Sequence, residues 1–377
     1  MRVLYIITGL STGGAETMLL KLLDRLDSQR YTPMVISLTT MGDIGPRIAA
    51  LGIPVQVLGM KPSLPSPIAF LSLLRSIKQF KPDIVHTWLY HADLLGGIAA
   101  RLAGVKRICW GIRSCNLDTD KTHWTTRAVR RVCALLSYVI PQRIFLNSET
   151  ARRIHVSLGY AKRKMSVVPN GFDLSRFKPD ETVRSRVRSS LGCTGDAPLV
   201  GMVGRFDPLK NHLGFISAMA LMRQQMPQVH LIMVGKGVDD DNEVLVRSLA
   251  EAGLSGNLHL LGARDDVPGL MTALDVLVSP SHAEAFPNVI GEAMAAGVPC
   301  VATDAGDCAY IIGDTGYVVP IGDIVGLARS VEALLRLSRM RQIELGQKAR
   351  LRVASHFEIS HVVRQYDDAY QSLKANL

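Results

Sequence analysis

The sequence predicts two doubly wound α/β domains, each built on a parallel sheet, and three observations support this fold class. The chain has 377 residues, which is more than one comfortable domain and fits two of ordinary size. Short apolar runs alternate with helical stretches along the whole length, as in successive βα units. The runs are largely apolar throughout, which indicates strands covered on both faces of a sheet.

The first half contains seven strand-like runs, which predict a first domain over residues 1–172. We expect strands at Val3–Thr8, Met34–Thr39, Pro54–Leu58, Asp83–Trp88, Arg107–Ile112, Arg143–Asn147 and Ser166–Pro169. Helices between them are expected at Glu16–Leu26, Ile44–Ala50, Ile68–Gln79 and Leu94–Leu102.

The second half repeats the scheme over residues 199–355. Its expected strands are Leu199–Val203, His230–Val234, Leu258–Leu260, Val276–Ser279, Cys300–Ala302 and Tyr317–Val319. The polar, breaker-rich stretch 173–198 is interpreted as the linker between the domains. A last helix, within about 356–377, is expected to pack back on the first domain. Two such domains should bind ligands at the carboxyl ends of their strands, in a central cleft where they face each other.

The positive charge is concentrated in the first half of the chain. Residues 1–170 hold 23 Lys and Arg against 9 Asp and Glu, whereas the remainder is mildly acidic. No nucleic-acid-binding motif accompanies this charge, so nucleic acid is not the expected partner. An anionic lipid surface, or an acceptor that bears phosphate, fits better.

The six cysteines are scattered and form no CxxC pair, which predicts reduced thiols in the cytoplasm and no zinc site. No apolar run reaches the length of a membrane-spanning helix. The short apolar N-terminus is interpreted as a buried strand rather than a signal peptide.

Two loops that follow strands carry features suited to phosphate. In the segment Thr8–Glu16, Gly13 and Gly14 let backbone amides approach a ligand at the start of a helix, although a tight turn explains them equally well. After Leu199–Val203, Arg205 and Lys210 emerge from a strand end, where two cations can neutralise a diphosphate. A solvated charge pair is the alternative for the second loop.

The strongest motif is the segment Ser281–Met294. Pro287 suits the first position of a helix, which leaves free amides near Phe286, Asn288 and Val289 to contact phosphate. Glu284 precedes this helix and Glu292 lies on it. A surface charge or a favourable helix-dipole contact would explain either glutamate alone, but not the whole run.

Glu284 and Glu292 form an E-x7-E pattern, and the chain resembles the retaining glycosyltransferase family 4, glycosyl transferases group 1. Other short matches occur in the family's order: Gly13–Glu16, Asn147-Ser148, Pro169–Gly171, Gly204-Arg205 with Lys210, Ala296–Pro299 and Gly313–Gly316. The resemblance implies a GT-B fold of two Rossmann-like domains and a nucleoside-diphosphate-sugar donor, commonly linked to UDP. It also implies metal-independent transfer of a hexose, so that no cofactor is expected.

The resemblance implies roles for individual residues. Arg205 and Lys210 would hold the diphosphate, Glu292 the ribose, Glu284 the sugar and Arg264 the base, with Glu284, Arg205 and Lys210 as the catalytic set. The expected donor-binding residues are Gly13, Gly14, Gly204, Arg205, Lys210, Gly235, Arg264, Glu284, Phe286, Pro287, Asn288, Val289 and Glu292.

The acceptor side departs from the family. Many relatives carry a histidine after the strand that matches Arg107–Ile112, whereas this chain has Arg113, which cannot act as a base at neutral pH. His86 and His91 remain candidates for acceptor contact, against the commoner structural role of a single histidine. The expected acceptor-binding residues are His86, Trp88, His91, Arg113 and Asn116.

Aromatic and basic residues alternate between Trp110 and Arg131, and the following stretch is apolar on much of its surface. We interpret this region as a patch that binds the inner face of an anionic membrane, although a basic surface beside a core helix would look similar.

The predicted function is sugar transfer to a glycan or lipid-linked acceptor in the synthesis of cell-surface polysaccharide or glycolipid. Two alternatives remain: a nucleotide-sugar epimerase of the same fold, and a non-catalytic nucleotide-sugar-binding partner.

Overall fold

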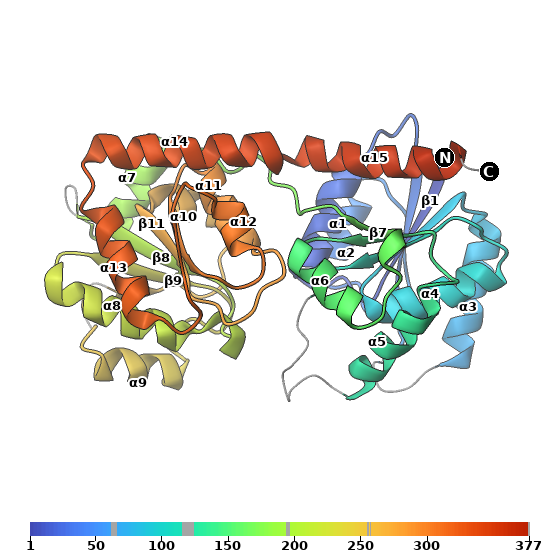
Figure 1. Ribbon diagram of the computed structural model, residues 1–377, viewed down its shortest axis with the longest axis horizontal. Coiled ribbons are helices and arrows are strands. Elements are labelled where there is room, and N and C mark those ends of the chain that lie inside the picture. The colour runs from blue at the N-terminus through green and yellow to red at the C-terminus, as the bar shows by residue number, and fades with distance from the viewer. Residues whose placement is uncertain (62–65, 115–123, 194–196, 255, 257, 376–377) are drawn as a thin grey trace. The chain divides into compact units, whose positions relative to one another are not determined.

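The computed structural model describes residues 1–61, 66–114, 124–193, 197–254, 256 and 258–375. The chain divides into two compact units, one formed by Met1–Gly171 with Ile359–Leu377 and the other by Phe172–Glu358 (Figure 1). Each unit is a parallel sheet with helices on both faces, as the sequence predicts.

The first unit holds a seven-stranded sheet in the order β3-β2-β1-β4-β5-β6-β7. The strands are β1 (Arg2–Ile7), β2 (Thr32–Ser37), β3 (Val55–Val57), β4 (Ile84–Trp88), β5 (Ile108–Ile112), β6 (Arg143–Leu146) and β7 (Met165–Val167). The helices are α1 (Gly14–Asp24), α2 (Ile44–Ala49), α3 (Pro67–Phe80), α4 (Tyr90–Leu102), α5 (Trp124–Leu136), α6 (Glu149–Ser157) and α15 (Ile359–Ala375).

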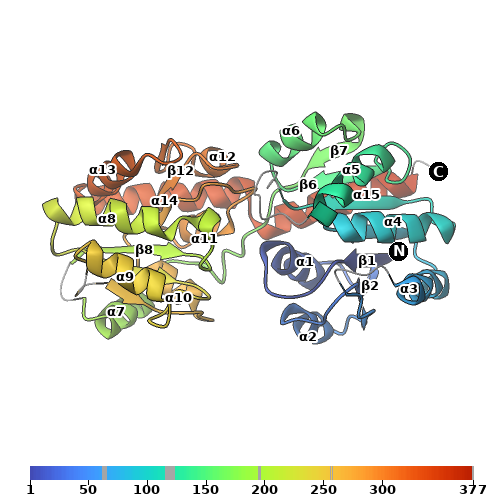
Figure 2. The same ribbon diagram turned by 90° about the horizontal axis from the view of Figure 1, so that it is seen from below.

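Two apolar layers hold this sheet between helices. Alternate residues of β1 face opposite ways, so that Tyr5 packs with α1, α2 and α15, while Ile6 packs with α3, α4, α5 and α6. The C-terminal helix α15 lies beside α1, and its Tyr366 and Tyr370 are fully buried in the first layer (Figures 1 and 2).

The second unit holds a six-stranded sheet in the order β10-β9-β8-β11-β12-β13. The strands are β8 (Leu199–Val203), β9 (His230–Val234), β10 (Leu258–Leu260), β11 (Val276–Ser279), β12 (Cys300–Thr303) and β13 (Tyr317–Val319). The helices are α7 (Glu181–Ser190), α8 (His212–Gln225), α9 (Glu243–Glu251), α10 (Val267–Ala273), α11 (Asn288–Ala295), α12 (Cys308–Ile312), α13 (Ile324–Leu335) and α14 (Arg339–His356).

The region expected to be a linker, 173–198, lies inside the second unit instead. Its centre forms α7, which begins at Glu181, because the side chain of the N-cap residue Asp180 accepts a hydrogen bond from the Val183 amide 3.0 Å away. The polar composition that suggested a linker belongs to a helix that exposes most of one side to solvent.

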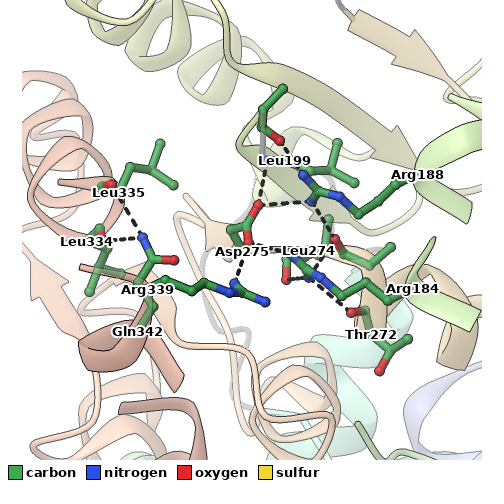
Figure 3. A network of polar contacts seen from close by, with 12 residues as sticks. Arg184, Arg188, Leu199, Thr272, Leu274, Asp275, Leu334, Leu335, Arg339 and Gln342 are labelled. Carbon is green, nitrogen blue, oxygen red and sulfur yellow. Dashed lines mark hydrogen bonds and ion pairs between the residues drawn. The ribbon is translucent and has the colours of Figure 1, made fainter. Parts of the chain in front are cut away.

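A buried charge network fastens α7 to the amino ends of β8 and β11 (Figure 3). The Asp275 carboxylate accepts hydrogen bonds from Arg184 at 2.6 Å, from Arg188 at 3.0 Å and from the Leu199 amide at 2.8 Å. Arg184 also donates to the Leu274 carbonyl oxygen and to two further carbonyls at the end of α10. These bonds pair carbonyl groups that the last turn of a helix leaves without partners.

No helix among the described residues has the length and apolar character needed to span a bilayer. Five cysteines, namely Cys109, Cys133, Cys193, Cys300 and Cys308, are buried free thiols, and Cys115 lies outside the described residues.

Candidate active site

The second sheet reverses its strand order between β8 and β11, and most of the expected donor-binding residues follow these two strands. Parallel sheets of this kind bind ligands outside the carboxyl ends of the strands at such a switch point. The loop after β8 carries Arg205 and Lys210, and the loop after β11 carries Glu284. The topology therefore brings together residues that are more than 70 positions apart in sequence.

Lys210 and Glu284 meet directly across the switch point. The Lys210 ammonium donates to Glu284 Oε1 at 2.5 Å, and the side chains are only 27% and 11% exposed. The Ser281 hydroxyl donates to the same oxygen at 2.8 Å. The structure thus joins two of the three expected catalytic residues in one partly buried ion pair.

Backbone contacts hold the two loops in register around this pair. The His282 amide donates to the Leu209 carbonyl oxygen at 2.8 Å, and the Asn211 side-chain amide donates to the Pro280 carbonyl oxygen at 3.1 Å. Asn211 has a left-handed backbone (φ 57°) and caps α8 by accepting a hydrogen bond from the Gly214 amide. The positions of Lys210 and Glu284 are therefore fixed by the backbone as well as by their own charge.

A glycine is required at the carboxyl ends of the strands beside the Lys210–Glu284 pair. A Cβ atom on Gly235, which has a φ of 155°, would lie 2.0 Å from the Gly204 carbonyl oxygen, so only glycine fits there. The Gly235 amide in turn donates to the Gly262 carbonyl oxygen at 2.8 Å. The ends of β8, β9 and β10 thus present backbone rather than side chains at this edge.

Arg205 and Arg264 lie outside the Lys210–Glu284 pair. Arg205 is exposed and donates to the Asp207 carboxylate at 3.0 Å. Arg264 is exposed too and forms a two-bond pair with Asp266, whose pKa is lowered by that hydrogen bond. Both guanidinium groups point to neighbouring carboxylates in this structure, and each can exchange that partner for an anionic ligand.

The helix α11 begins one residue later than expected. Pro287 is its N-cap (φ −73°, ψ 102°) and the helix starts at Asn288, with no side chain capping its first turn. Phe286 is buried, whereas Asn288, Val289 and Glu292 are half-buried. The N-terminus of α11 therefore follows Glu284 closely in the chain and carries the partial positive charge that favours an anion.

In the first unit, Gly13 is the N-cap of α1 and Gly14 its first residue. A Cβ atom on Gly13 would lie 2.4 Å from a carboxylate oxygen of Glu16, so the glycine gives space to that carboxylate. Glu16 occupies the third helical position, from which a carboxylate reaches back over the N-terminus of its own helix. Gly13 and Gly14 thus lie at the start of a helix, with the carboxylate of Glu16 beside them.

The prediction that His86 and Trp88 contact the acceptor does not fit the structure. Both are fully buried in β4, where His86 Nδ1 lies 2.7 Å from the Tyr370 hydroxyl among aromatic rings. Burial, and to a smaller extent the charge of Arg113, lowers the pKa of His86 well below its usual value, which keeps the ring neutral. Both side chains are part of the core beneath α15.

The other three acceptor candidates have different surroundings. His91 is half-buried at the start of α4, and burial lowers its pKa. Arg113 follows β5 and contacts Asn170, Tyr366 and the Trp88 ring. Asn116 lies outside the described residues.

Sequence reasoning missed three residues that shape the site: Asn211, Ser281 and Gly306. A Cβ atom on Gly306 (φ 63°) would lie 2.2 Å from the Glu284 carbonyl oxygen, which explains this glycine after β12. An Asn directly before a helical run is a cap signal that could have been recognised. The contact of Ser281 is local, since its hydroxyl bonds Glu284 three residues later. The contact of Gly306 depends on tertiary structure and left no local signal.

Comparisons with known proteins identify both halves of the chain. The family described as Glycosyltransferase Family 4 matches residues 12–176, and that described as Glycosyl transferases group 1 matches residues 197–337. The second match contains the Lys210–Glu284 pair and the start of α11.

Similar proteins match most of the chain. The UDP-Gal:alpha-D-GlcNAc-diphosphoundecaprenol alpha-1,3-galactosyltransferase of Escherichia coli is 28% identical over 82% of this chain and 80% of its own length. The lipopolysaccharide core biosynthesis mannosyltransferase LpsB of Rhizobium meliloti is 25% identical over 89% of this chain and 93% of its own. The Anabaena protein HepE in complex with UDP has the same fold, with a TM-score of 0.87, 24% identity and coverage of 99% and 100%.

Proposed function

The chain belongs to glycosyltransferase family 4, and on this premise we propose that it moves a hexose from a UDP-sugar to a lipid-linked glycan, with retention of the anomeric configuration. The observation that carries the proposal is the Lys210–Glu284 ion pair at the switch point of the second sheet. The choice of UDP is supported by the name of the Escherichia coli relative and by the UDP bound to HepE.

Each donor group has a candidate partner at this edge of the second sheet. Lys210 and Arg205 bind the diphosphate, and the first-turn amides of α11 add a partial positive charge. Glu284 binds hydroxyl groups of the sugar, and Glu292, one turn further along α11, binds the ribose. Arg264, after β10, contacts the base. Gly204 and Gly235 are half-buried and carry no side chain, which lets the nucleotide approach the backbone closely.

Charge stabilisation drives the proposed reaction. The bond between the sugar C1 and the diphosphate oxygen breaks, a bond from C1 to the acceptor oxygen forms on the same face, and the acceptor proton passes to the leaving diphosphate. Negative charge grows on that diphosphate, and Lys210 is held within the site before the donor arrives. No group of three or more His, Cys, Asp or Glu residues among those described has the geometry of a metal site.

The acceptor belongs to the first unit in this proposal, with His91 and Arg113 as the contacts that remain after His86 and Trp88 are assigned to the core. The Escherichia coli relative acts, by its name, on a sugar linked to diphosphoundecaprenol, and LpsB on the lipopolysaccharide core. We therefore assign this chain to the synthesis of cell-surface polysaccharide or glycolipid at the cytoplasmic face of a membrane.

The helix α5 supplies a surface for that membrane. Trp124 and Leu135 are 77% and 76% exposed, and Val132 is exposed on the same stripe of the helix. Arg127 and Arg131 are exposed beside these apolar residues, whereas Arg130 is buried. An exposed apolar stripe flanked by arginines is typical of helices that lie in the interface of an anionic bilayer.

We expect the double substitution Trp124→Ser and Leu135→Ser to weaken binding to vesicles rich in phosphatidylglycerol by about tenfold or more, because two large apolar contacts with the bilayer are lost. Co-sedimentation with the vesicles measures the change. Leu351→Ser, at a leucine on α14 that is 65% exposed, is the control and should leave binding unchanged. Equal vesicle binding by the double variant and the wild type would contradict the assignment of α5.

The transfer reaction is tested by incubating the full chain with a panel of UDP- and GDP-sugars, with and without bacterial membrane lipid, in the presence of EDTA. We expect nucleotide release that depends on both the lipid and one UDP-sugar, together with a labelled lipid product of retained configuration. An isomerised donor without any lipid product would indicate an epimerase. Donor binding without release would indicate a non-catalytic partner.

A further inference from the structure

Arg113 is a buried cation at the carboxyl edge of the first sheet. It directly follows β5 and is 9% exposed. One terminal nitrogen donates to Asn170 Oδ1 at 2.9 Å and the other donates to the Tyr366 hydroxyl. The guanidinium lies over the Trp88 ring, 4.2 Å from its centroid. These contacts fix the side chain, yet they use only two of its five N–H groups.

No anion compensates this charge within the described part of the chain. The partners of Arg113 are an amide, a hydroxyl group and an indole ring, and no carboxylate of a described residue forms an ion pair with it. Asp93 is fully buried nearby, and burial raises its pKa to about 8, although the hydrogen bond from Thr87 and the charge of Arg113 act to lower it. A buried guanidinium without a counter-ion is costly, and proteins keep one where a ligand supplies the charge.

Three buried polar atoms at the same edge of the sheet have no hydrogen-bond partner among the described residues, namely Thr8 Oγ1, Arg113 Nε and Asn147 Oδ1. Thr8, Arg113 and Asn147 directly follow β1, β5 and β6 of one parallel sheet. Buried polar atoms are nearly always paired, so these atoms are suited to contact a ligand. Two of the three atoms can donate, which favours an acceptor-rich ligand.

We propose that Arg113 binds a phosphate or diphosphate group carried by the acceptor substrate, with the Thr8 hydroxyl as a second donor. This rests on the proposed function, because it defines the chemical class of the acceptor of that reaction. The planar guanidinium matches the spacing of phosphate oxygens and stays charged at every physiological pH.

The test measures binding of decyl diphosphate and of decanol to the full chain by calorimetry, alongside UDP. The wild type should bind decyl diphosphate much more tightly than decanol. Arg113→Met keeps the length of the side chain without its charge, and it should weaken decyl diphosphate binding by about tenfold or more, since hydrogen bonds to charged groups are lost. UDP affinity should stay unchanged in this variant. Arg153→Met, at an exposed arginine on α6, is the matched control and should bind like the wild type.

Two further variants and one competitor sharpen the result. Arg113→Lys keeps the charge and should bind decyl diphosphate more tightly than Arg113→Met. Thr8→Val should weaken binding of decyl diphosphate several-fold. This second variant tests the site even if Arg113→Met does not fold. Inorganic phosphate at constant ionic strength should compete with decyl diphosphate in the wild type. Unchanged diphosphate affinity in folded Arg113→Met, or phosphate binding without competition, would overturn the inference. If the wild type does not bind UDP, that result would instead contradict the proposed function.

Discussion

Replacing Lys210 by alanine should lower kcat for sugar transfer by about 100-fold to 1,000-fold, the cost typical of removing one preorganised charge-stabilising group. The Lys210 ammonium is held by Glu284 at 2.5 Å in a partly buried site, so it needs little reorganisation to meet the leaving diphosphate. Steady-state kinetics with saturating donor and acceptor measure the effect. Lys210→Arg keeps the charge and should recover part of the rate.

The control for this experiment is Lys348→Ala, at an exposed lysine on α14, which should leave kcat unchanged. Thermal unfolding of both variants shows whether the fold is retained, because loss of Lys210 leaves the Glu284 carboxylate with one fewer donor. A folded Lys210→Ala variant with a near-normal kcat would contradict the proposed role of this lysine. Arg205→Ala should have a smaller effect, since Arg205 is exposed and must leave Asp207 to reach a ligand.

The fold could be predicted from the sequence because its strands are buried on both faces. Val3–Thr8 and the other apolar runs each correspond to a strand within about two residues, and glycine-rich or capped loops mark where helices begin. The linker was misplaced for a related reason. The helix α7 has a largely polar surface, so its sequence looks like a solvated connection, and its attachment through Arg184 and Arg188 to Asp275 is visible only in three dimensions.

The candidate site was predictable in part. Glu284, Lys210 and Gly235 stand directly after strands or in a recognisable motif, so topology alone brings them to one edge. The prediction that His86 contacts the acceptor was wrong, because its position at a strand end does not reveal which way the side chain points. In the structure it contacts Tyr370 of α15, 284 residues later in the chain, and aromatic rings of that helix help to bury it. Contacts between such distant segments leave no trace in local spacing.

Replacing Asp275 by asparagine should destabilise the second unit by about 3–5 kcal/mol, the cost of leaving buried cations without their partner. Asp275 compensates Arg184 and Arg188 and also contacts the exposed Arg339 (Figure 3). The side chains of Asp275, Arg184 and Arg188 are almost fully buried. The midpoint of thermal unfolding should fall by at least about 6 °C, measured by calorimetry on the full chain. Glu251→Gln, which breaks the exposed pair with Arg247, is the control and should cost less than about 0.5 kcal/mol.

A second substitution tests whether uncompensated charge is the cause. Adding Arg188→Met to Asp275→Asn removes one of the two buried guanidinium groups that lack a counter-ion in Asp275→Asn. The loss in free energy of unfolding should therefore be smaller for the double variant than the sum of the two single losses. An Asp275→Asn shift no larger than that of Glu251→Gln would contradict the buried network. Asp275 lies at the amino ends of β8 and β11, whereas Lys210 and Glu284 follow their carboxyl ends. Below its unfolding temperature, the Asp275→Asn variant should therefore have the kcat of the wild type. Lys210→Ala should show the opposite behaviour, with a retained fold and a low kcat.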